Sequence, residues 1–171
     1  MIIEGRALKY GDDINTDVIL PGRYLVLTDP RELARHAMEG IDPSFLKKVS
    51  SRCILVAGRN FGCGSSREHA VIALKYSGIK AIIAESYARI FFRNALNMGL
   101  VAIECRGIAR SVDEGDLLRI RMNEGIVENL SKNLTLRFRK YPPLLLEILQ
   151  SGGLVNYLRE KLKVRNRRND I

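Results

Sequence analysis

Residues 53–85 read CILVAGRNFGCGSSREHAVIALKYSGIKAIIAE, and this stretch decides the fold. It opens with an apolar run, Cys53–Ala57, and closes with a second one at 79–85, while the segment between them ends at Gly78. Apolar runs of this length are typical of buried strands, and the segment that joins them has the spacing and the terminal glycine of a helix. A strand, a helix and a second strand predict a right-handed crossover between parallel strands.

The same alternation continues downstream. The segment YARIFFRNALNMG, residues 87–99, predicts a helix that ends at Gly99, and LVAIE at 100–104 predicts a third buried strand. Strands that alternate with helices predict the α/β class, with a parallel sheet covered by helices.

The flanking segments add elements on both sides. Asp29 and Pro30 suit the cap and the first position of a helix in DPRELARHAME. LLRIR at 117–121 and LTLRF at 134–138 predict an antiparallel pair of strands, and GGLVNYLREKL at 152–162 predicts the last helix.

Length and composition favour a single domain. The chain has 171 residues, of which 46% are hydrophobic, which is enough for one packed core. We place this domain at residues 1–162 and treat 163–171 as a basic tail. No run approaches the ~20 apolar residues of a membrane span, and the opening MIIEGRALKYGDD lacks the features of a signal peptide. We therefore expect a cytoplasmic protein that contacts no membrane.

The formal net charge of +9 would suit a nucleic-acid partner, but its distribution does not. Much of the excess lies at 159–171, where RNRRND at 165–170 lacks apolar periodicity and predicts a frayed, solvated end. Aromatic residues make up only 6% of the chain, which offers little for base stacking. We expect no nucleic acid as partner, and docking of RNA on the basic tail remains an alternative.

Cysteine and histidine usage predicts no metal site. Cys53, Cys63 and Cys105 form no CxxC pair and have no histidine cluster nearby, so reduced thiols are expected. The two histidines, His36 and His69, have no carboxylate at the spacing of a metal site.

The glycine-rich turn GRNFGCGSSRE, which follows the first strand, predicts an anion site. Anions collect where a parallel strand turns into a helix, because free backbone N–H groups point outward there. The turn lacks the lysine of a P-loop and the third glycine of a dinucleotide fingerprint. Ser65, Ser66 and Arg67, which we expect on the first turn of the following helix, instead offer hydroxyls and a planar guanidinium, which suits the carboxylate of a small organic acid. A plain capping role, with Ser65 or Ser66 as the cap and Glu68 closing a capping box, is the structural alternative.

Three motifs together resemble one family. They are GDDINTD at 11–17, GRNFGCGSSREHA at 58–70 and AESYARIFFRNALNMG at 84–99. In this order they resemble the small subunits of the aconitase-like hydro-lyases, and the resemblance extends from residue 1 to about residue 157. Within that superfamily the sequence is similar to the 3-isopropylmalate dehydratase type of leucine biosynthesis, with the homoaconitase type as the alternative.

The resemblance implies a fold, a partner and a cofactor. The fold would be the aconitase swivelling domain, with β/β/α layers in which a parallel sheet packs against a further small sheet and helices. The substrate would be a small 2-hydroxy diacid. A large catalytic subunit would carry a 4Fe-4S cluster as Lewis acid, and this chain would bind no cofactor itself. The two would form a heterodimer or heterotetramer, and the isolated small subunit would self-associate.

The resemblance also implies roles for residues of the turn. Ser65 matches the serine that takes the proton from carbon, and Ser66 and Arg67 match residues that hold a substrate carboxylate. Asp17, in the acidic loop with Asp12 and Asp13, matches an acid that orients catalytic groups, although loop acids of this kind also serve as turns and caps.

Three further residues are expected to serve structure instead. Arg89 and Arg93 would pair with Glu85 or with the partner, with contact to the substrate as the alternative, and Cys63 would be a small loop filler.

The short stretch YLVL, residues 24–27, is expected to read the side group of the substrate. By the resemblance Tyr24, Val26 and Leu27 lie over that group, and homoaconitase-type chains carry arginine at the position of Val26. An apolar Val26 favours an isopropyl group over a carboxylate. The alternative is that Val26 is a core residue and that Arg23 supplies a charge.

A stand-alone anion-binding or regulatory module remains the competing function of another class.

Overall fold

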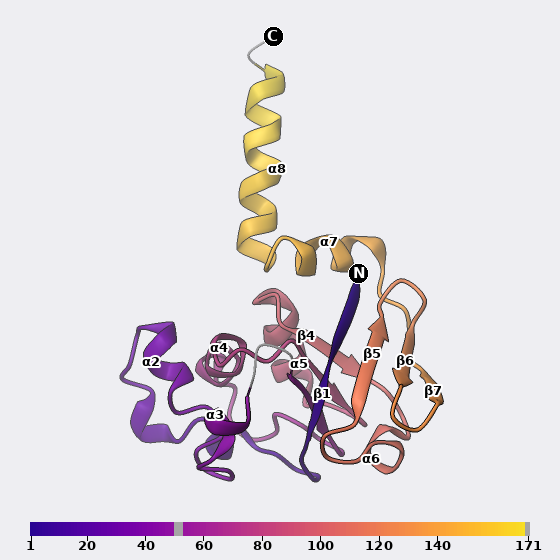
Figure 1. Ribbon diagram of the computed structural model, residues 1–171. Coiled ribbons are helices and arrows are strands. Elements are labelled where there is room, and N and C mark those ends of the chain that lie inside the picture. Colours follow the sequence, from indigo (N-terminus) through magenta and orange to yellow (C-terminus); the bar gives the residue numbers. More distant parts are fainter. Residues whose placement is uncertain (50–52, 170–171) are drawn as a thin grey trace.

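The computed structural model describes residues 1–49 and 53–169, with side chains as far as Lys163. Hydrogen bonds join its strands into a seven-stranded sheet in the order β4-β3-β2-β1-β5-β6-β7 (Figure 1). The parallel half comprises β1 (Ile2–Lys9), β2 (Cys53–Ala57), β3 (Ala81–Ala84) and β4 (Val101–Glu104). The antiparallel half comprises β5 (Leu117–Arg121), β6 (Ile126–Asn129) and β7 (Leu134–Arg137).

The predicted pairing of LLRIR with LTLRF is wrong, because β6 lies between β5 and β7 and pairs with both. β1, which sequence reasoning did not identify, joins the two halves: it runs parallel to β2 and antiparallel to β5. Its half-buried pattern contrasts with the fully buried β2. The predicted α/β class is correct.

Two cores cover the two faces of the parallel half. Along β2, Leu55 and Ala57 face one core while Ile54 and Val56 face the other, as the period of two in a strand requires. The first core contains residues of α2 (Pro30–Ala34), α3 (Phe45–Lys48), α4 (Glu68–Tyr76) and α5 (Arg89–Asn97). The second contains residues of α6 (Ile108–Ser111) and α7 (Pro143–Gln150), together with β5 and β6. The antiparallel half therefore curls over one face, which gives the expected β/β/α layers within one hydrogen-bonded sheet.

The predicted start of α2 is correct, whereas the last helix, α8, continues beyond its predicted end. Asp29 accepts a hydrogen bond from the backbone N–H of Arg31 at 2.7 Å, and Pro30 begins α2, as predicted. α8 (Leu154–Asn169) stands away from the body in Figure 1. The frayed end predicted from residue 165 is therefore wrong as far as Asn169, because the backbone stays helical to that residue.

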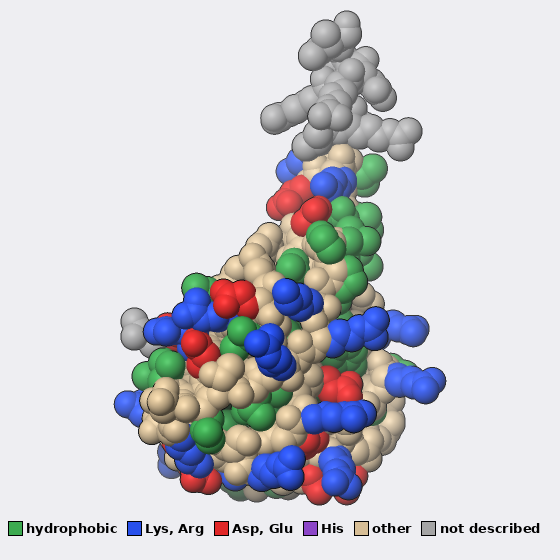
Figure 2. All heavy atoms as spheres, turned by 90° about the vertical axis from the view of Figure 1, so that its right-hand side faces the viewer, with side chains coloured by type: hydrophobic (Ala, Val, Ile, Leu, Met, Phe, Trp, Pro, Cys, Tyr) green, Lys and Arg blue, Asp and Glu red, His purple; other side chains and the backbone are tan. Residues whose placement is uncertain are grey.

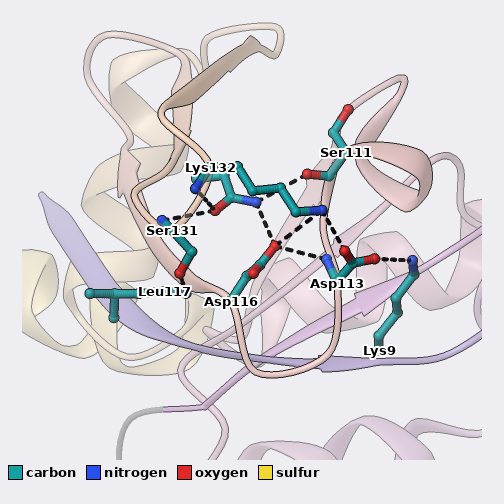
Figure 3. Close-up of polar contacts among 8 residues, drawn as sticks. Lys9, Ser111, Asp113, Asp116, Leu117, Ser131 and Lys132 are labelled. Atoms are coloured by element: carbon teal, nitrogen blue, oxygen red, sulfur yellow. Dashed lines mark hydrogen bonds and ion pairs between the residues drawn. The ribbon is translucent and has the colours of Figure 1, made fainter.

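A buried asparagine fixes the turn between β6 and β7. Figure 3 labels its partners Ser111, Asp116, Ser131 and Lys132. Asn129 is 1% exposed, and its amide donates to Ser111 O at 3.0 Å and to Asp116 Oδ2 at 2.7 Å. Its carbonyl oxygen accepts from the backbone N–H groups of Ser131 and Lys132. A buried amide with all these partners costs little, so this network holds the antiparallel half together.

The end of α5 depends on a glycine. Gly99 has φ +75°, and a Cβ there would lie 2.3 Å from the carbonyl carbon of Gly152. We expect Gly99→Ala to lower the free energy of unfolding by about 2–4 kcal/mol, because backbone strain and overlap add. Gly115→Ala is the matched control, since Gly115 has φ +82° but no atom within 4 Å of the added Cβ, and only about 1 kcal/mol is expected. Urea unfolding measures both, and equal losses would contradict the role of the close approach.

Candidate functional site

The candidate site lies in the loop between β2 and α4, at the carboxyl edge of the parallel strands. Gly62 has φ +76°, and a Cβ there would lie 2.1 Å from the ring of Phe91. Gly64 has φ +89°. The loop therefore requires glycine for its backbone and for close contact with α5. This edge is where ligands collect in open α/β sheets.

A cavity of about 290 Å³ opens beside this loop. It brings together three of the predicted site residues, Ser65, Ser66 and Arg67, with residues from two other segments. The complete lining is Thr16, Gly62, Gly64, Ser65, Ser66, Arg67, Ala88, Arg89, Ile90 and Phe91. The cavity thus combines hydroxyls and guanidinium groups with an apolar wall, a mixture that suits a small organic acid.

Ser65 is exposed, and a buried threonine holds its backbone. Thr16, 1% exposed, donates from Oγ1 to Ser65 O at 2.9 Å, and the two hydroxyl oxygens lie 3.4 Å apart. The backbone N–H of Thr16 also donates to Cys63 O at 2.9 Å. Sequence reasoning missed Thr16, although it lies inside the motif GDDINTD; a threonine between two recognised positions was the available signal.

Arg67 forms an ion pair with Asp17, through Nη1 and Oδ1. The Arg67 side chain is 22% exposed and that of Asp17 is 58% exposed, so the pair lies at the surface of the site. Arg67 has extended backbone and is the cap residue of α4, without a side-chain cap hydrogen bond. The predicted placement of Ser65, Ser66 and Arg67 on the first helical turn is therefore wrong, as is the capping alternative. The two serines precede the helix and stay available to a ligand.

The other loop acids serve the turn. Asp12 Oδ1 accepts from the backbone N–H of Arg59 at 2.6 Å, and Asp13 Oδ1 accepts from the Asn60 amide at 2.8 Å. They tie the N-terminal loop to the glycine-rich turn and leave Asp17 as the acid that contacts the site.

The residues of the YLVL loop (24–27), which were expected to lie over the substrate side group, are not among those that line this cavity. It follows η1 (Gly22–Tyr24), and a Cβ built on Gly22 would lie 3.7 Å from Arg67 Nη1. Val26 is 83% exposed, so the alternative that it is a core residue is wrong. Leu27 packs against the first core, as does Tyr24. The loop thus begins beside Arg67 and presents Val26 outward.

Arg89 lines the cavity, as the alternative that it contacts substrate requires. Arg93 is exposed on the same helix. The expected pairing of either arginine with Glu85 is wrong: the Glu85 carboxylate accepts from the backbone N–H groups of Gly107 at 2.8 Å and Ala109 at 3.0 Å. No ion pair of Glu85 occurs among the described residues.

Comparisons with known proteins agree with this geometry. Residues 31–107 match the aconitase C-terminal domain family. The isopropylmalate/citramalate isomerase small subunit of Methanocaldococcus jannaschii is 53% identical over 161 residues, which cover 94% of this chain and 96% of the relative. Further relatives, about half identical over most of the chain, are named 3-isopropylmalate dehydratase small subunit. The chain belongs to the 3-isopropylmalate dehydratase small-subunit family.

Two further likenesses define its place in the small-subunit family. A crystal structure of a 3-isopropylmalate dehydratase from M. jannaschii has a TM-score of 0.92 at 50% identity, covering 98% of this chain and 99% of that chain. The aconitase-type fold expected from the sequence is thereby confirmed. The methanogen homoaconitase small subunit of the same organism is 51% identical over 168 residues, 98% of each chain. Overall identity is therefore nearly equal for the two names and does not by itself separate them.

Members of this small-subunit family are named as subunits, which implies a second chain for those relatives. Within residues 1–49 and 53–163, no group of three or more His, Cys, Asp or Glu residues is arranged to hold a metal ion. Burial, followed by the charge of Asp13, raises the pKa of the Cys63 thiol, which makes the thiolate that a metal would need less available. Among the described residues, no helix is both long enough and apolar enough to span a bilayer.

Proposed function

We propose that this chain is the small subunit of a hydro-lyase that interconverts 2-isopropylmalate and 3-isopropylmalate, and that it is active only with a large subunit. The observation that carries the proposal is the cavity beside Ser65, where hydroxyls and Arg67 meet in a chain about half identical to small subunits of that name. The homoaconitase-type reaction is the second candidate, because a relative of that name is 51% identical.

In the proposed reaction, one side chain transfers a proton at carbon and two others bind a substrate carboxylate. Removal of water from a 2-hydroxy diacid breaks a C–H and a C–O bond, and re-addition in the other orientation forms them on the exchanged carbons. Ser65 Oγ takes the proton from carbon and later returns one. Ser66 and Arg67 hold a carboxylate, for which the guanidinium offers two parallel donors. A 4Fe-4S cluster in the large subunit supplies the Lewis acid for the departing hydroxyl.

Asp17 has an orienting role in this proposal. Its ion pair with Arg67 fixes the guanidinium before substrate arrives, and preorganised donors need no rearrangement during the reaction. The substrate carboxylate then shares Arg67 with Asp17.

The exposure of Ser65 supports the proposed dependence on a partner. A serine hydroxyl is a weak base, and in water its alkoxide is not favoured at neutral pH. The Arg67 charge and the N-terminus of α4 favour an anion at this place, and their effect grows when a docked large subunit excludes water. The partner therefore both supplies the Lewis acid and activates the base.

The direct test mixes the purified chain with candidate large subunits under anaerobic conditions. Hydration and dehydration of isopropylmalate, citramalate and homoaconitate are then assayed, with each subunit alone as control. Turnover of isopropylmalate by the pair alone supports the proposal. Preference for the tricarboxylate favours the homoaconitase alternative. Inactivity with every large subunit points to an anion-binding module, and nucleic acid retained through purification in moderate salt points to an RNA-binding one.

Arg67→Lys is expected to raise KM and lower kcat together. An ammonium cannot reproduce the two parallel hydrogen bonds of a guanidinium, and we expect kcat/KM to fall about 10- to 100-fold, the loss of one charge-assisted hydrogen bond or slightly more. Steady-state kinetics of the assembled pair measure the change. Unaltered kinetics would show that Arg67 serves only the structure of the loop.

The isolated chain is expected to be folded, colourless and inactive, and to self-associate. α8 carries exposed apolar side chains, Val155 at 60%, Leu158 at 49% and Leu162 at 57%, and Figure 2 shows hydrophobic side chains gathered along this helix. Exposed apolar surface of this kind favours association in the absence of a partner. Sedimentation at several concentrations measures the assembly, and visible absorption measures any iron–sulfur cluster that the chain has bound. A monomer at high concentration, or a cluster bound by this chain alone, would contradict these expectations.

A further inference from the structure

Glu39 binds three side chains at once, away from the cavity beside Ser65. Its Oε1 accepts from the Tyr24 hydroxyl at 2.7 Å and from Arg23 Nη2 at 2.5 Å, and its Oε2 lies 2.6 Å from His36 Nδ1. The Tyr24 ring also stacks on His36, with centroids 3.6 Å apart and planes 11° from parallel, and Arg23 Cζ lies 4.7 Å from the Tyr24 ring centroid. This arrangement joins the start of the YLVL loop to the segment that follows α2.

The backbone on either side of Glu39 is hydrogen-bonded to α1 (Thr16–Ile19), the helix that carries two site residues. On one side of Glu39, the backbone N–H of Met38 donates to Ile19 O at 2.7 Å. On the other side, the Gly40 N–H donates to Val18 O at 3.1 Å. Glu39 is therefore held rigidly relative to the helix that supplies Thr16 and Asp17.

The loop residues that Glu39 binds lie next to residues with proposed roles at the site. Gly22, next to Arg23, lies beside the guanidinium of Arg67, and Val26 follows Tyr24 by two residues. Tyr24, Leu25 and Leu27 also pack against the first core. The backbone hydrogen bonds within the loop are short-range, such as Leu25 N–H to Gly22 O at 3.2 Å and Leu27 N–H to Tyr24 O at 3.1 Å. A loop held by such bonds opens easily unless side chains anchor it.

We infer that Glu39 is a positioning residue that anchors the YLVL loop over the substrate side group and thereby sets substrate affinity and selection. Its effect on substrate rests on the proposed function, whereas the anchoring itself does not. Glu39 acts through Tyr24 and Arg23 and touches no reacting atom.

A carboxylate suits this task because one oxygen accepts two donors while the other remains free for His36. Hydrogen bonds from Tyr24, and then from His36 and Arg23, lower the pKa of Glu39 to about 2, so it is ionised at neutral pH. Glutamine keeps the oxygen that accepts from Tyr24 and Arg23, whereas alanine removes every acceptor. The pair of variants thus separates anchoring from net charge.

Hydrogen–deuterium exchange of the full chain tests the anchoring without any assay of activity. Glu39→Ala is expected to raise exchange in residues 20–28 about tenfold, the effect of losing a charge-assisted hydrogen bond. Glu39→Gln should change it less than about threefold. Exposed Glu32 lies on α2, away from the loop contacts, and Glu32→Ala is the matched control with no expected change. Exchange in β2 reports whether each variant is folded, and Tyr24→Phe, which removes only one hydroxyl, serves if Glu39→Ala does not fold.

Kinetics of the assembled pair test the consequence. Glu39→Ala should raise KM for isopropylmalate about tenfold with kcat changed less than about threefold, and Glu39→Gln should restore most of the affinity. Wild-type exchange in Glu39→Ala, or equal losses in the alanine and glutamine variants, would overturn the inference. A wild-type pair without hydro-lyase activity would instead contradict the proposed function, while the exchange result would still decide whether Glu39 anchors the loop.

Discussion

Ser65→Ala is expected to lower kcat of the assembled pair by about 10²- to 10⁴-fold, the usual contribution of a positioned general base. KM should change little, because the substitution removes a proton acceptor and almost no binding surface. The fold should also be preserved. Thr16 donates to the backbone oxygen of Ser65, which alanine retains, while the contact between the two hydroxyl oxygens is long at 3.4 Å.

The neighbouring serine provides the comparison. Ser66 lines the same cavity but is assigned to binding, so Ser66→Ala should mainly raise KM. Assembly with the large subunit is measured by sedimentation for both variants, so that loss of the complex is not mistaken for loss of chemistry. Turnover of Ser65→Ala near the wild-type rate would remove Ser65 from its assigned role, and equal effects of both substitutions on kcat would show that the loop acts as a unit.

The second large effect is a change of substrate preference in Val26→Arg. Val26 is 83% exposed, so an arginine fits there without displacing the core, and stability should stay within about 0.5 kcal/mol of the wild type. Burial of an isopropyl group against valine contributes on the order of 1–3 kcal/mol. A carboxylate at that place loses water without finding a charge partner, because Arg23 is bound to Glu39.

The measurement is the ratio of kcat/KM for isopropylmalate to that for a homoaconitate-type tricarboxylate, with the same large subunit. Val26→Arg should shift the ratio at least about 100-fold toward the tricarboxylate, because attraction of one substrate and rejection of the other add. Thr28→Arg places the same charge on an exposed residue of the same segment and should shift it less than about threefold. A ratio unmoved by Val26→Arg, or moved equally by the control, would show that the YLVL loop does not read the side group.

Local patterns predicted three of the four strands of the parallel half, together with the helices that join them. β2, β3 and β4 lie where apolar runs end at glycine or polar residues, and α5 lies within the predicted segment 87–99. β1 and β6 were missed because their half-buried patterns are weak in isolation. Their identity as strands depends on pairing with segments far away in the chain, and the pairing of β6 between β5 and β7 is what made the predicted antiparallel pair wrong.

The same contrast between local patterns and long-range contacts applies to the candidate site. Ser65, Ser66 and Arg67 could be proposed from the turn and the resemblance, because hydroxyls and a guanidinium beside a glycine-rich turn indicate an anion. Thr16 was missed, because its role is a hydrogen bond across 49 residues of sequence and its place inside the motif GDDINTD was the only signal. The order of polar groups at the start of α4 was also misjudged: Arg67 takes the cap position while its side chain is held by Asp17, 50 residues away.

The sequence by itself determined the α/β class, the glycine-rich turn after β2 and the family, since these depend on periodicity, glycines and motifs within short stretches. The tertiary structure decided which groups meet: Thr16 with Ser65, Asp17 with Arg67, and Glu39 with Tyr24. Each of these contacts is a hydrogen bond of about 3 Å or less, a distance that only the packing of separate segments on a common sheet can set. The residue types determine which hydrogen bonds are chemically possible, and the positions of the residues in the fold determine which of them form.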